Sequence, residues 1–545
     1  MSSSSASRME YLRAGAVSST VPTRFRLNVS PPTLLGLVGG GLALVLLLGL
    51  PEPWNISLPL YLVLFFWTLL QPRVALYLLP IAIPWGSLQY IDVGELRLNS
   101  ADLLVVFLAL GWLLSFTLPW VKFRGRVSAV SNDARGPTDR EISNVPSYLV
   151  VAMLALLGIM FLSMIVATSV STSLKEISKW SEFLVLILLG AQYIRTRRQI
   201  WIIVVLICLA GITQAVYGYY QEFFNLGPAN FIRDASLRVY GTFDQPNPYA
   251  GYINIPLSIA LALALLGRGW KTRILSGLAA LLLGVAEFLS QSKGGYSAIA
   301  VALLFIVVVG MLRFRPVMGL LGIGTLGFLG AAFAGWVPAK LYTPVLEKIG
   351  VINISFTAPS SQDYANAERL AHWIAGLRMF FDHPFLGVGI GNYPNAYPQY
   401  YITIFVNSLG HAHNYYINIA AETGFIGLVV YLFFLGAIFV AGGSAYRGIN
   451  RKYVQERISH KIEAPLGTLN KLYALLGNSV GFDVRTALTN DRALALGLLA
   501  ALLSVCVHNL VDDLYVHSMT NLIALLIIAL IRLERVTPEV GSNTE

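Results

Sequence analysis

The chain has 545 residues, of which 56% are hydrophobic and only 12% are charged, and its mean hydropathy is +0.66. Soluble globular domains carry about a quarter charged residues, so this composition excludes a soluble enzyme and predicts a polytopic membrane protein. The net charge of +10 does not indicate nucleic acid, because the basic residues gather in short segments between apolar runs, where they set membrane orientation. Cys208 and Cys506 both lie inside apolar runs and support neither a disulfide framework nor a cysteine-based metal site.

In chain order, a basic, serine-rich N-terminus at 1–32 is expected to be disordered. After it, apolar runs of about 18 to 20 residues recur, each long enough to cross roughly 30 Å of hydrocarbon. The expected fold is all-α and polytopic, with about 12–14 transmembrane helices. The candidate spans are 33–50, 56–71, 73–88, 101–119, 147–168, 179–195, 199–221, 248–267, 273–291, 294–312, 317–336, 418–442, 492–511 and 516–533.

Basic segments occupy every second connection, which predicts that these connections are cytoplasmic. They are "VKFRGR" (121–126), "RTRR" (195–198), "GRGWKTR" (267–273), "RFRP" (313–316) and "YRGINRKYVQER" (446–457). The connections at 222–247, 290–295, 337–413 and 509–517 then share the extracytoplasmic face. We expect N-terminal transmembrane helices at 33–178, a transmembrane core at 179–336, a long external loop at 337–413, C-terminal helices at 414–535 with a cytoplasmic loop at 446–491, and a cytoplasmic tail at 536–545.

The long external loop contains the segment "AERLAHWIAGLRMFFDHPFLG" (367–387), which has helical periodicity. Leu370, Ile374, Leu377 and Phe381 recur at the spacing of one helical face, which predicts an amphipathic helix on the membrane surface. The helix should end near Asp382, because a proline at 384 disfavours helical geometry in the residue before it. The following "GVGIGN" has the glycines of a dinucleotide fingerprint but follows a helix rather than a strand, so no nucleotide site is expected.

Three cations are expected on the outer face, namely Arg238 in "RVYGTFDQPNPYAGY" (238–252), Lys293 in "SQSKGGYS" and Arg369 in the loop helix, with Arg233 nearby. Each alone is typical of a surface residue that keeps its charge in water. Together they predict a site for an anionic headgroup, and for a diphosphate above all, because arginine offers paired donors to phosphate oxygens.

His411 and His413 stand directly before the span in "HAHNYYINIAAETGFIG" (411–427). Their spacing of two does not suit a metal pair on a helix, so two interpretations stay open: a structural end to the span, or a general base. Asp512 and Asp513 form a carboxylate pair that could bind a divalent metal or act in acid–base chemistry. The favoured interpretation is that they orient or neutralise the basic cluster. Asn247 could contact a glycan.

These motifs resemble the superfamily of O-antigen ligases and O-antigen polymerases, which are polytopic bacterial glycosyltransferases. The late signature of that family, a His and an Asn followed after nine residues by Gly-x-x-Gly, is filled by His413, Asn414, Gly424 and Gly427. The "HP" and glycine-rich turn after the loop helix, and "RVYGTFDQPNPYAGY", are similar to further family segments. The resemblance covers roughly residues 180 to 535.

The resemblance implies a glycan donor on a polyprenyl diphosphate, a glycolipid or glycan acceptor, and a site on the extracytoplasmic face of the bacterial inner membrane. It assigns His413 as the base or acceptor-positioning group, and Arg238 and Arg369 as ligands of the diphosphate. Lys293 stands where the family often has arginine, so the charge is kept and the paired donors are lost. His411, Asn414, Asn247, Asp512 and Asp513 are candidate supporting residues. No metal, nucleotide or other cofactor is implied.

Two functions from different classes remain open on the sequence. The first is a glycosyltransferase, acting as a ligase on a lipid A core or as a polymerase on another lipid-linked repeat, with a protein acceptor as a less favoured variant. The second is a transporter of an anion such as bicarbonate. Transporters tend to place polar sites near the bilayer midplane, whereas the polar residues here gather toward one face, so the transferase is favoured.

Overall fold

The computed structural model describes residues 61–117 apart from 62, 70, 89–90 and 94–95, and then 145–233, 236–311, 315–344, 355–359, 364–463 and 484–537. The expected N-terminus and the span at 33–50 lie outside these residues. So do the first part of the span at 56–71, residues 118–144, two parts of the long loop at 345–354 and 360–363, residues 464–483, and the end of the C-terminal tail.

The fold is all-α, as the sequence predicts. Its described helices are α4 (Arg73–Trp85), α5 (Ser100–Thr117), α6 (Ser147–Ser163), α7 (Val170–Tyr193), α8 (Arg197–Phe223), α9 (Pro246–Leu266), α10 (Trp270–Leu289), α11 (Lys293–Gly310), α12 (Arg315–Phe333), α14 (Tyr364–Asp382), α15 (Tyr393–Ala396), α16 (Tyr415–Glu463), α18 (Val484–His508) and α19 (Met519–Val536). Two short antiparallel hairpins pair β1 (Ile91–Val93) with β2 (Leu96–Leu98), and β3 (Ile232–Arg233) with β4 (Ser236–Leu237).

Every expected span from 73–88 onward overlaps one of these helices. Within the described residues, seven helical segments are long and apolar enough to cross a membrane, and they correspond to α6, α8, α9, α10, α11, α16 and α18. The protein is therefore a multi-pass membrane protein. The apolar runs are long because each must cross the thickness of the hydrocarbon. They are helical because a helix satisfies its backbone hydrogen bonds internally.

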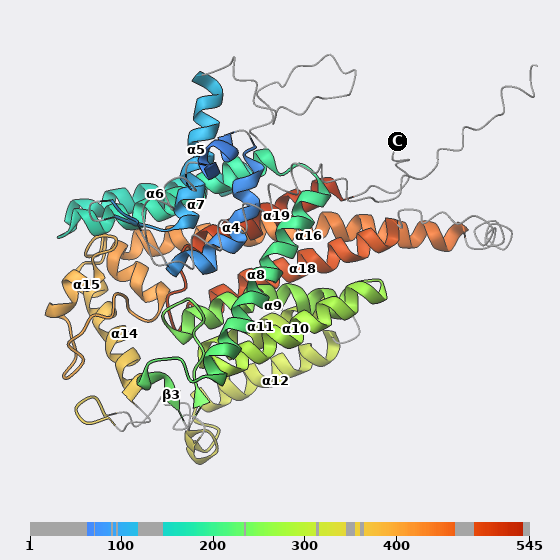
Figure 1. Cartoon of the computed structure of the whole chain (residues 1–545). Helices are drawn as coiled ribbons and strands as arrows, with labels where there is room; N and C mark the ends of the chain where they lie inside the picture. The colour runs from blue at the N-terminus through green and yellow to red at the C-terminus, as the bar shows by residue number, and fades with distance from the viewer. Residues whose placement is uncertain are drawn as a thin grey trace, which may run out of the picture.

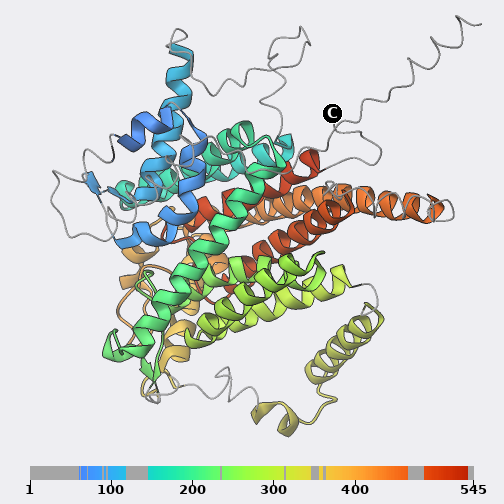
Figure 2. The same cartoon turned by 45° about the vertical axis from the view of Figure 1, so that its right-hand side comes forward.

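The centre of the bundle is formed by α9, α18 and α19, most of whose residues are buried. Figure 1 shows α4 to α7 above this centre and α10 to α12 below it, with α14 and α15 across the ends of the helices at the left. In Figure 2, α8 runs obliquely between the upper and lower groups, and α12 stands apart. The glycines of α12 accordingly face open space. Helices α14 and α15 thus cover one end of the bundle.

The loop helix α14 ends at Asp382, where the proline rule placed its end. Its buried face consists of Ala367, Ala371, His372, Ala375, Gly376 and Met379. Leu377 and Phe381, from the expected apolar stripe, are exposed instead, and Phe381 keeps 71% of its surface accessible. Small side chains let α14 pack closely against α16, whereas Leu377 and Phe381 lie on the exposed side of the helix and Leu370 and Ile374 are half-buried. That this outward stripe touches lipid stays a prediction.

The glycines of the external loop serve close packing. The N–H groups of Val388 and Gly389 donate to the carbonyls of Ala421 and Glu422 at 2.9 and 3.0 Å, so the segment 387–392 is fastened along the first turns of α16. Helix α16 itself is interrupted at Gly424, which has φ 68° and ψ −167°. A Cβ built there would lie 2.3 Å from the carbonyl carbon of Phe385. The glycine-rich segment 387–392 therefore packs backbone to backbone against the start of α16.

The variant Gly424→Ala should lower stability strongly. The residue would have to hold a positive φ, at a cost of roughly 1–3 kcal/mol, and its methyl group would overlap the backbone of Phe385. We expect a lower thermal midpoint and less monodisperse protein on gel filtration in detergent. Gly436→Ala, on the same helix with open space at its Cβ position, is the matched control. Equal midpoints for the two variants would contradict the close approach.

Candidate active site

Two connecting segments meet at the end of the bundle that carries α14. One is the loop 509–518 between α18 and α19, and the other is the segment 411–414 before α16. The Oδ1 atom of Asn414 accepts hydrogen bonds from the N–H groups of Tyr416 and Ile417 at 2.9 and 3.1 Å, so Asn414 begins α16 as asparagine commonly begins helices. Its Nδ2 atom donates to the Leu510 carbonyl at 2.8 Å. Asn414 therefore joins the two segments.

Asp512 lies at the centre of this junction and is only 3% exposed. Its Oδ1 atom is 3.6 Å from Nδ1 of His413 and 3.8 Å from Nε2 of His411. Its Oδ2 atom accepts a hydrogen bond of 2.7 Å from Nδ2 of Asn247. The N–H group of Asp513 donates to Oδ1 at 2.9 Å. The structure thus brings together four of the residues that the sequence singled out, from positions 247, 411, 413 and 512.

The carboxyl group of Asp512 is negatively charged at neutral pH. Burial opposes this charge, but the neighbouring His413, His411 and His508 outweigh burial and hold the pKa of Asp512 well below its usual range. Burial, and then the nearby His413, lower the pKa of His411 to about 4, although Asp512 opposes the shift. At neutral pH the cluster therefore holds one carboxylate and a neutral His411.

His411, His413 and Asp512 lie close enough to hold a metal ion, with their candidate ligand atoms within 4.8 Å of one another. The hydrogen bonding of His411 argues against such a site. Its Nδ1 atom accepts a hydrogen bond of 3.0 Å from the N–H group of His413. A neutral imidazole with an accepting Nδ1 carries its proton on Nε2, so His411 presents N–H to Asp512 rather than a lone pair to a metal.

His413 is held by its backbone and by neighbouring rings. Its φ of 52° is in the left-handed region, and its carbonyl accepts a hydrogen bond of 3.1 Å from the indole of Trp373. The ring packs edge-on against those of His411 and His372, with centroids 4.5 and 5.3 Å apart. No described group makes a hydrogen bond to its buried Nδ1 atom, and 3.6 Å to Asp512 is too long for one. A modest shift would close this gap.

His372 is a site residue that the sequence did not single out. It is fully buried, its Nδ1 atom lies 3.0 Å from the hydroxyl of Tyr393, and its ring stacks on Tyr397 at 4.7 Å. Burial, and then the nearby His413 and His411, lower the pKa of His372 to about 3. In the sequence it occupies an ordinary position on an amphipathic helix, and no spacing signal separates it from packing residues.

The low pKa of His372 predicts a specific loss of stability in mild acid. In the unfolded chain its pKa is near 6.5, so below pH 6.5 the unfolded state binds a proton that the folded state refuses until about pH 3. Stability from this residue is complete above pH 6.5 and falls as the pH is lowered. Between pH 7.5 and 5 the thermal midpoint should fall more for the wild type than for His372→Gln, by an amount equivalent to about 2 kcal/mol. Parallel pH profiles for the two proteins would refute this.

The three predicted cations differ in how they are held. The Nε atom of Arg238 donates to the Ser290 carbonyl at 3.2 Å, and its terminal nitrogen donates to Oδ1 of Asn247 at 3.2 Å. Arg369 is half-buried and forms no hydrogen bond or ion pair with the part of the chain that the structure describes, although its charge acts on His411 and His508. Lys293 is exposed at the start of α11. The side chain of Arg233 lies outside the described residues.

The two adjacent carboxylates have separate partners. Asp513 accepts a hydrogen bond of 2.8 Å from the N–H group of Tyr515. Lys179 of α7 donates to the Tyr515 carbonyl at 2.9 Å and pairs with Glu176 at 2.5 Å. Burial raises the pKa of Asp513 to about 6, and the charge of Lys179 partly offsets that effect. Asp512 thus faces the histidines while Asp513 shapes its own loop. Lys179 was not recognised in the sequence, because it lies in an expected membrane span.

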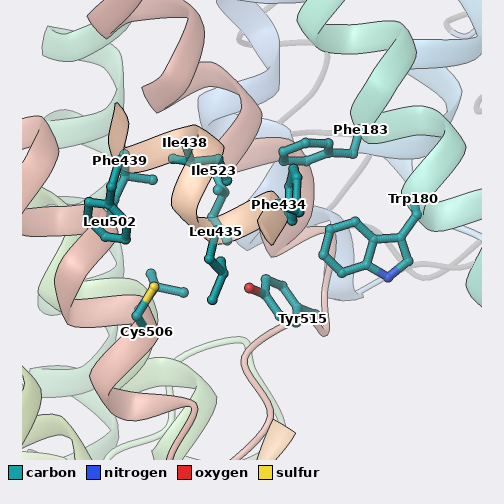
Figure 3. A pocket seen from close by; sticks show the side chains of 11 residues that line it. Trp180, Phe183, Phe434, Leu435, Ile438, Phe439, Leu502, Cys506, Tyr515 and Ile523 are labelled. Carbon is teal, nitrogen blue, oxygen red and sulfur yellow. The ribbon is translucent and has the colours of Figure 1, made fainter. Parts of the chain in front are cut away.

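Beneath the loop is a small cavity lined almost entirely by apolar side chains. Figure 3 shows Trp180 and Phe183 of α7, Phe434 of α16 and Tyr515 of the loop around it. The Tyr515 hydroxyl is 2.8 Å from that of Tyr431. The ring of Trp180 packs edge-on against Tyr515 at 5.0 Å. These contacts fix the side of the loop that faces the bundle, and they leave its other side to the histidines.

Comparison with known proteins bears on this arrangement. Residues 278–432 match the model of a family described as O-antigen ligase. This match supports membership of the O-antigen ligase and polymerase superfamily. No curated protein matches the chain. The matched region includes Lys293, Arg369, His411, His413 and Asn414, whereas Arg238, Asn247 and Asp512 lie outside it. The match bears out the resemblance over this region and supports a glycosyltransferase-like enzyme in a membrane.

Proposed function

We propose that the protein transfers a glycan from a polyprenyl diphosphate to a hydroxyl group of an acceptor, either a lipid A core or another lipid-linked repeat. The transfer takes place on the extracytoplasmic face of the bacterial inner membrane and contributes to cell-surface polysaccharide synthesis. The observation that carries this proposal is the placement of His413 beside the ionised Asp512, in a cluster that also reaches Arg238.

His413 acts as the general base. When its Nδ1–H faces Asp512, its Nε2 atom offers a lone pair. The acceptor hydroxyl attacks the anomeric carbon of the donor sugar, and its proton passes to Nε2 of His413. The bond from that carbon to the diphosphate oxygen breaks, and the diphosphate leaves with the electron pair. Asp512 stabilises the imidazolium that forms. A single displacement of this kind inverts the anomeric configuration, and a product with retained configuration would rule it out.

The diphosphate is held by cations. Arg369 supports this role because its guanidinium forms no ion pair or hydrogen bond within the described residues. Arg238 and Lys293 supply further positive charge. Since a diphosphate is already a good leaving group, the protein mainly has to bind its charge, stabilise the charge that grows as it departs, and aim the acceptor. The tautomer of His411 supports a reaction that needs no metal ion.

The position of the cluster supports a transferase over a transporter. His411, His413 and Asp512 lie in connections at the ends of α16, α18 and α19 rather than within the helices. Transport sites are typically built near the bilayer midplane on interrupted helices.

The test is glycan transfer by purified protein in liposomes, with a polyprenyl-diphosphate-linked repeat as donor, in the presence and absence of a lipid A core. A ladder of products from donor alone would identify a polymerase. A single shift that requires the core would identify a ligase. The same reactions with and without a strong chelator test metal independence, and chelator-sensitive transfer would contradict it. If intact protein gives no product with several donors, the proposal fails, and anion flux into the same liposomes becomes the measurement for a transporter.

A further inference from the structure

The side-chain amide of Asn247 forms hydrogen bonds to Arg238, which is assigned to the glycan donor, and to Asp512, which lies beside the proposed base. Its Oδ1 atom accepts from Arg238 at 3.2 Å and from the Ser292 hydroxyl at 3.1 Å. Its Nδ2 atom donates to Oδ2 of Asp512 at 2.7 Å. Asn247 belongs to the first turn of α9, a helix that begins with Pro246 and is buried along most of its length. The amide therefore sits on a rigid element.

The orientation of this amide follows from its partners. A guanidinium can only donate hydrogen bonds and a carboxylate can only accept them. The oxygen of Asn247 must therefore face Arg238, and the nitrogen must face Asp512. Reversing the amide would oppose donor to donor on one side and acceptor to acceptor on the other. Hydrogen bonds connect Arg238 through Asn247 to Asp512, and Oδ1 of Asp512 then lies 3.6 Å from Nδ1 of His413.

We propose that Asn247 is a positioning residue that couples occupation of the diphosphate site at Arg238 to the orientation of Asp512, and through Asp512 to that of His413. This inference rests on the proposed function. An anion bound to Arg238 fixes the guanidinium, and the guanidinium fixes the amide oxygen. The amide nitrogen then holds Oδ2 of Asp512, so that Oδ1 stays directed at His413. The base is aligned most firmly when a donor is bound.

The proposal makes a distinct claim for Asn247→Ala. The variant keeps Arg238, Asp512 and His413 but loses their connection, so kcat at saturating donor should fall by about 10- to 100-fold, the range for losing a hydrogen bond to a charged group. The KM for donor should change little. Arg238→Ala, by contrast, should raise the KM for donor. A kcat within twofold of the wild type for Asn247→Ala would overturn the proposal.

A double-mutant cycle separates coupling from a merely structural role. If Asn247 acts through Asp512, then Asn247→Ala should cost almost nothing further once Asp512→Asn is present. If Asn247 only supports the packing of α9, the two losses should multiply, and the proposal fails. Gel filtration and thermal midpoints of all three variants establish that they are folded.

The pH profile of Asn247→Asp supplies the readout that a structural role would not move. The new carboxyl group would face Asp512 at the amide's distance, and two such carboxyl groups must share a proton to stay together. The charged and titratable groups around the pair come from several elements, namely Arg238, Arg369, His411, His413, His508 and Asp513. Relative to the wild type at each pH, activity should fall as the pH rises, by up to about tenfold per pH unit.

Two controls complete the design. Asn450→Asp changes an asparagine about 35 residues after the start of α16, whose Oδ1 atom accepts a hydrogen bond from Arg492. The ratio of its rate to the wild-type rate should not change with pH. The ratio of Asn247→Ala should also stay flat, because that variant introduces no titrating group. A flat ratio for Asn247→Asp, or multiplying losses in the cycle, overturns the coupling. A wild type that transfers no glycan overturns the proposed function instead, so the two failures are distinguishable.

Discussion

Replacing His413 by alanine should lower the kcat of glycan transfer by about 10²- to 10⁴-fold, the usual contribution of a positioned general base. The rates should be compared at neutral pH, where Asp512 is ionised. The measurement is initial rate at saturating donor and acceptor, with folding checked by gel filtration. A variant that keeps more than a tenth of the wild-type rate would remove His413 from the role of base.

Two further substitutions show whether the loss is chemical. Asparagine tolerates the left-handed backbone that His413 adopts, so His413→Asn preserves the local fold and should be as inactive as the alanine variant. His411→Ala removes one polar neighbour of Asp512 and the acceptor for the His413 N–H group, and should cost only about tenfold. His460→Ala, far along α16, should have no effect. Equal losses at 411 and 413 would mean that the pair acts only structurally.

Replacing Arg369 by alanine should lower kcat/KM for the donor by about 100-fold or more, because a bidentate contact to phosphate would be lost. Arg369 forms no hydrogen bond or ion pair within the described residues, so its removal leaves no such partner stranded there, and the protein should remain folded. Arg369→Lys should recover part of the loss, since lysine restores charge without the fork. The measurement is a donor titration at fixed acceptor.

Arg378→Ala is the matched control for this experiment. Arg378 lies on the same helix, α14, but its side chain is exposed, and its removal should leave the donor KM unchanged. If Arg369→Ala and Arg378→Ala behave alike, the diphosphate assignment of Arg369 is wrong.

The helices were largely predictable from sequence because membrane spans can be recognised by their length and apolar content. From the span at 73–88 onward, each expected span has a helix at its position. The packing face of α14 was less accessible. The sequence shows a stripe with Leu377 and Phe381, yet the buried face is made of alanines, a glycine and His372. Large apolar residues indicate burial in a soluble core, but the close packing of α14 against α16 selects small ones.

The candidate site was predictable as a set of residues and not as a geometry. The sequence singled out His413, Asp512 and Asn247, which are separated by 99 to 265 residues. Nothing in it showed that they share one cluster. The tautomer of His411 depends on a backbone N–H two residues later, a contact that only the turn conformation creates. Lys179 and His372 were overlooked because a charge near a span end and a histidine on an amphipathic helix both have ordinary structural explanations.

The loop 509–518 has a consequence for the biosynthesis of the protein. Its bonds reach back to Asn99, Lys179, Asn247, Asn414 and Tyr415. All of these partners precede the loop in the sequence, so each is synthesised before Asp512. Termination after His413 but before Asp512 would yield a chain that keeps the imidazole and lacks the carboxylate beside it. Under the proposed function, such a truncated chain should be inactive.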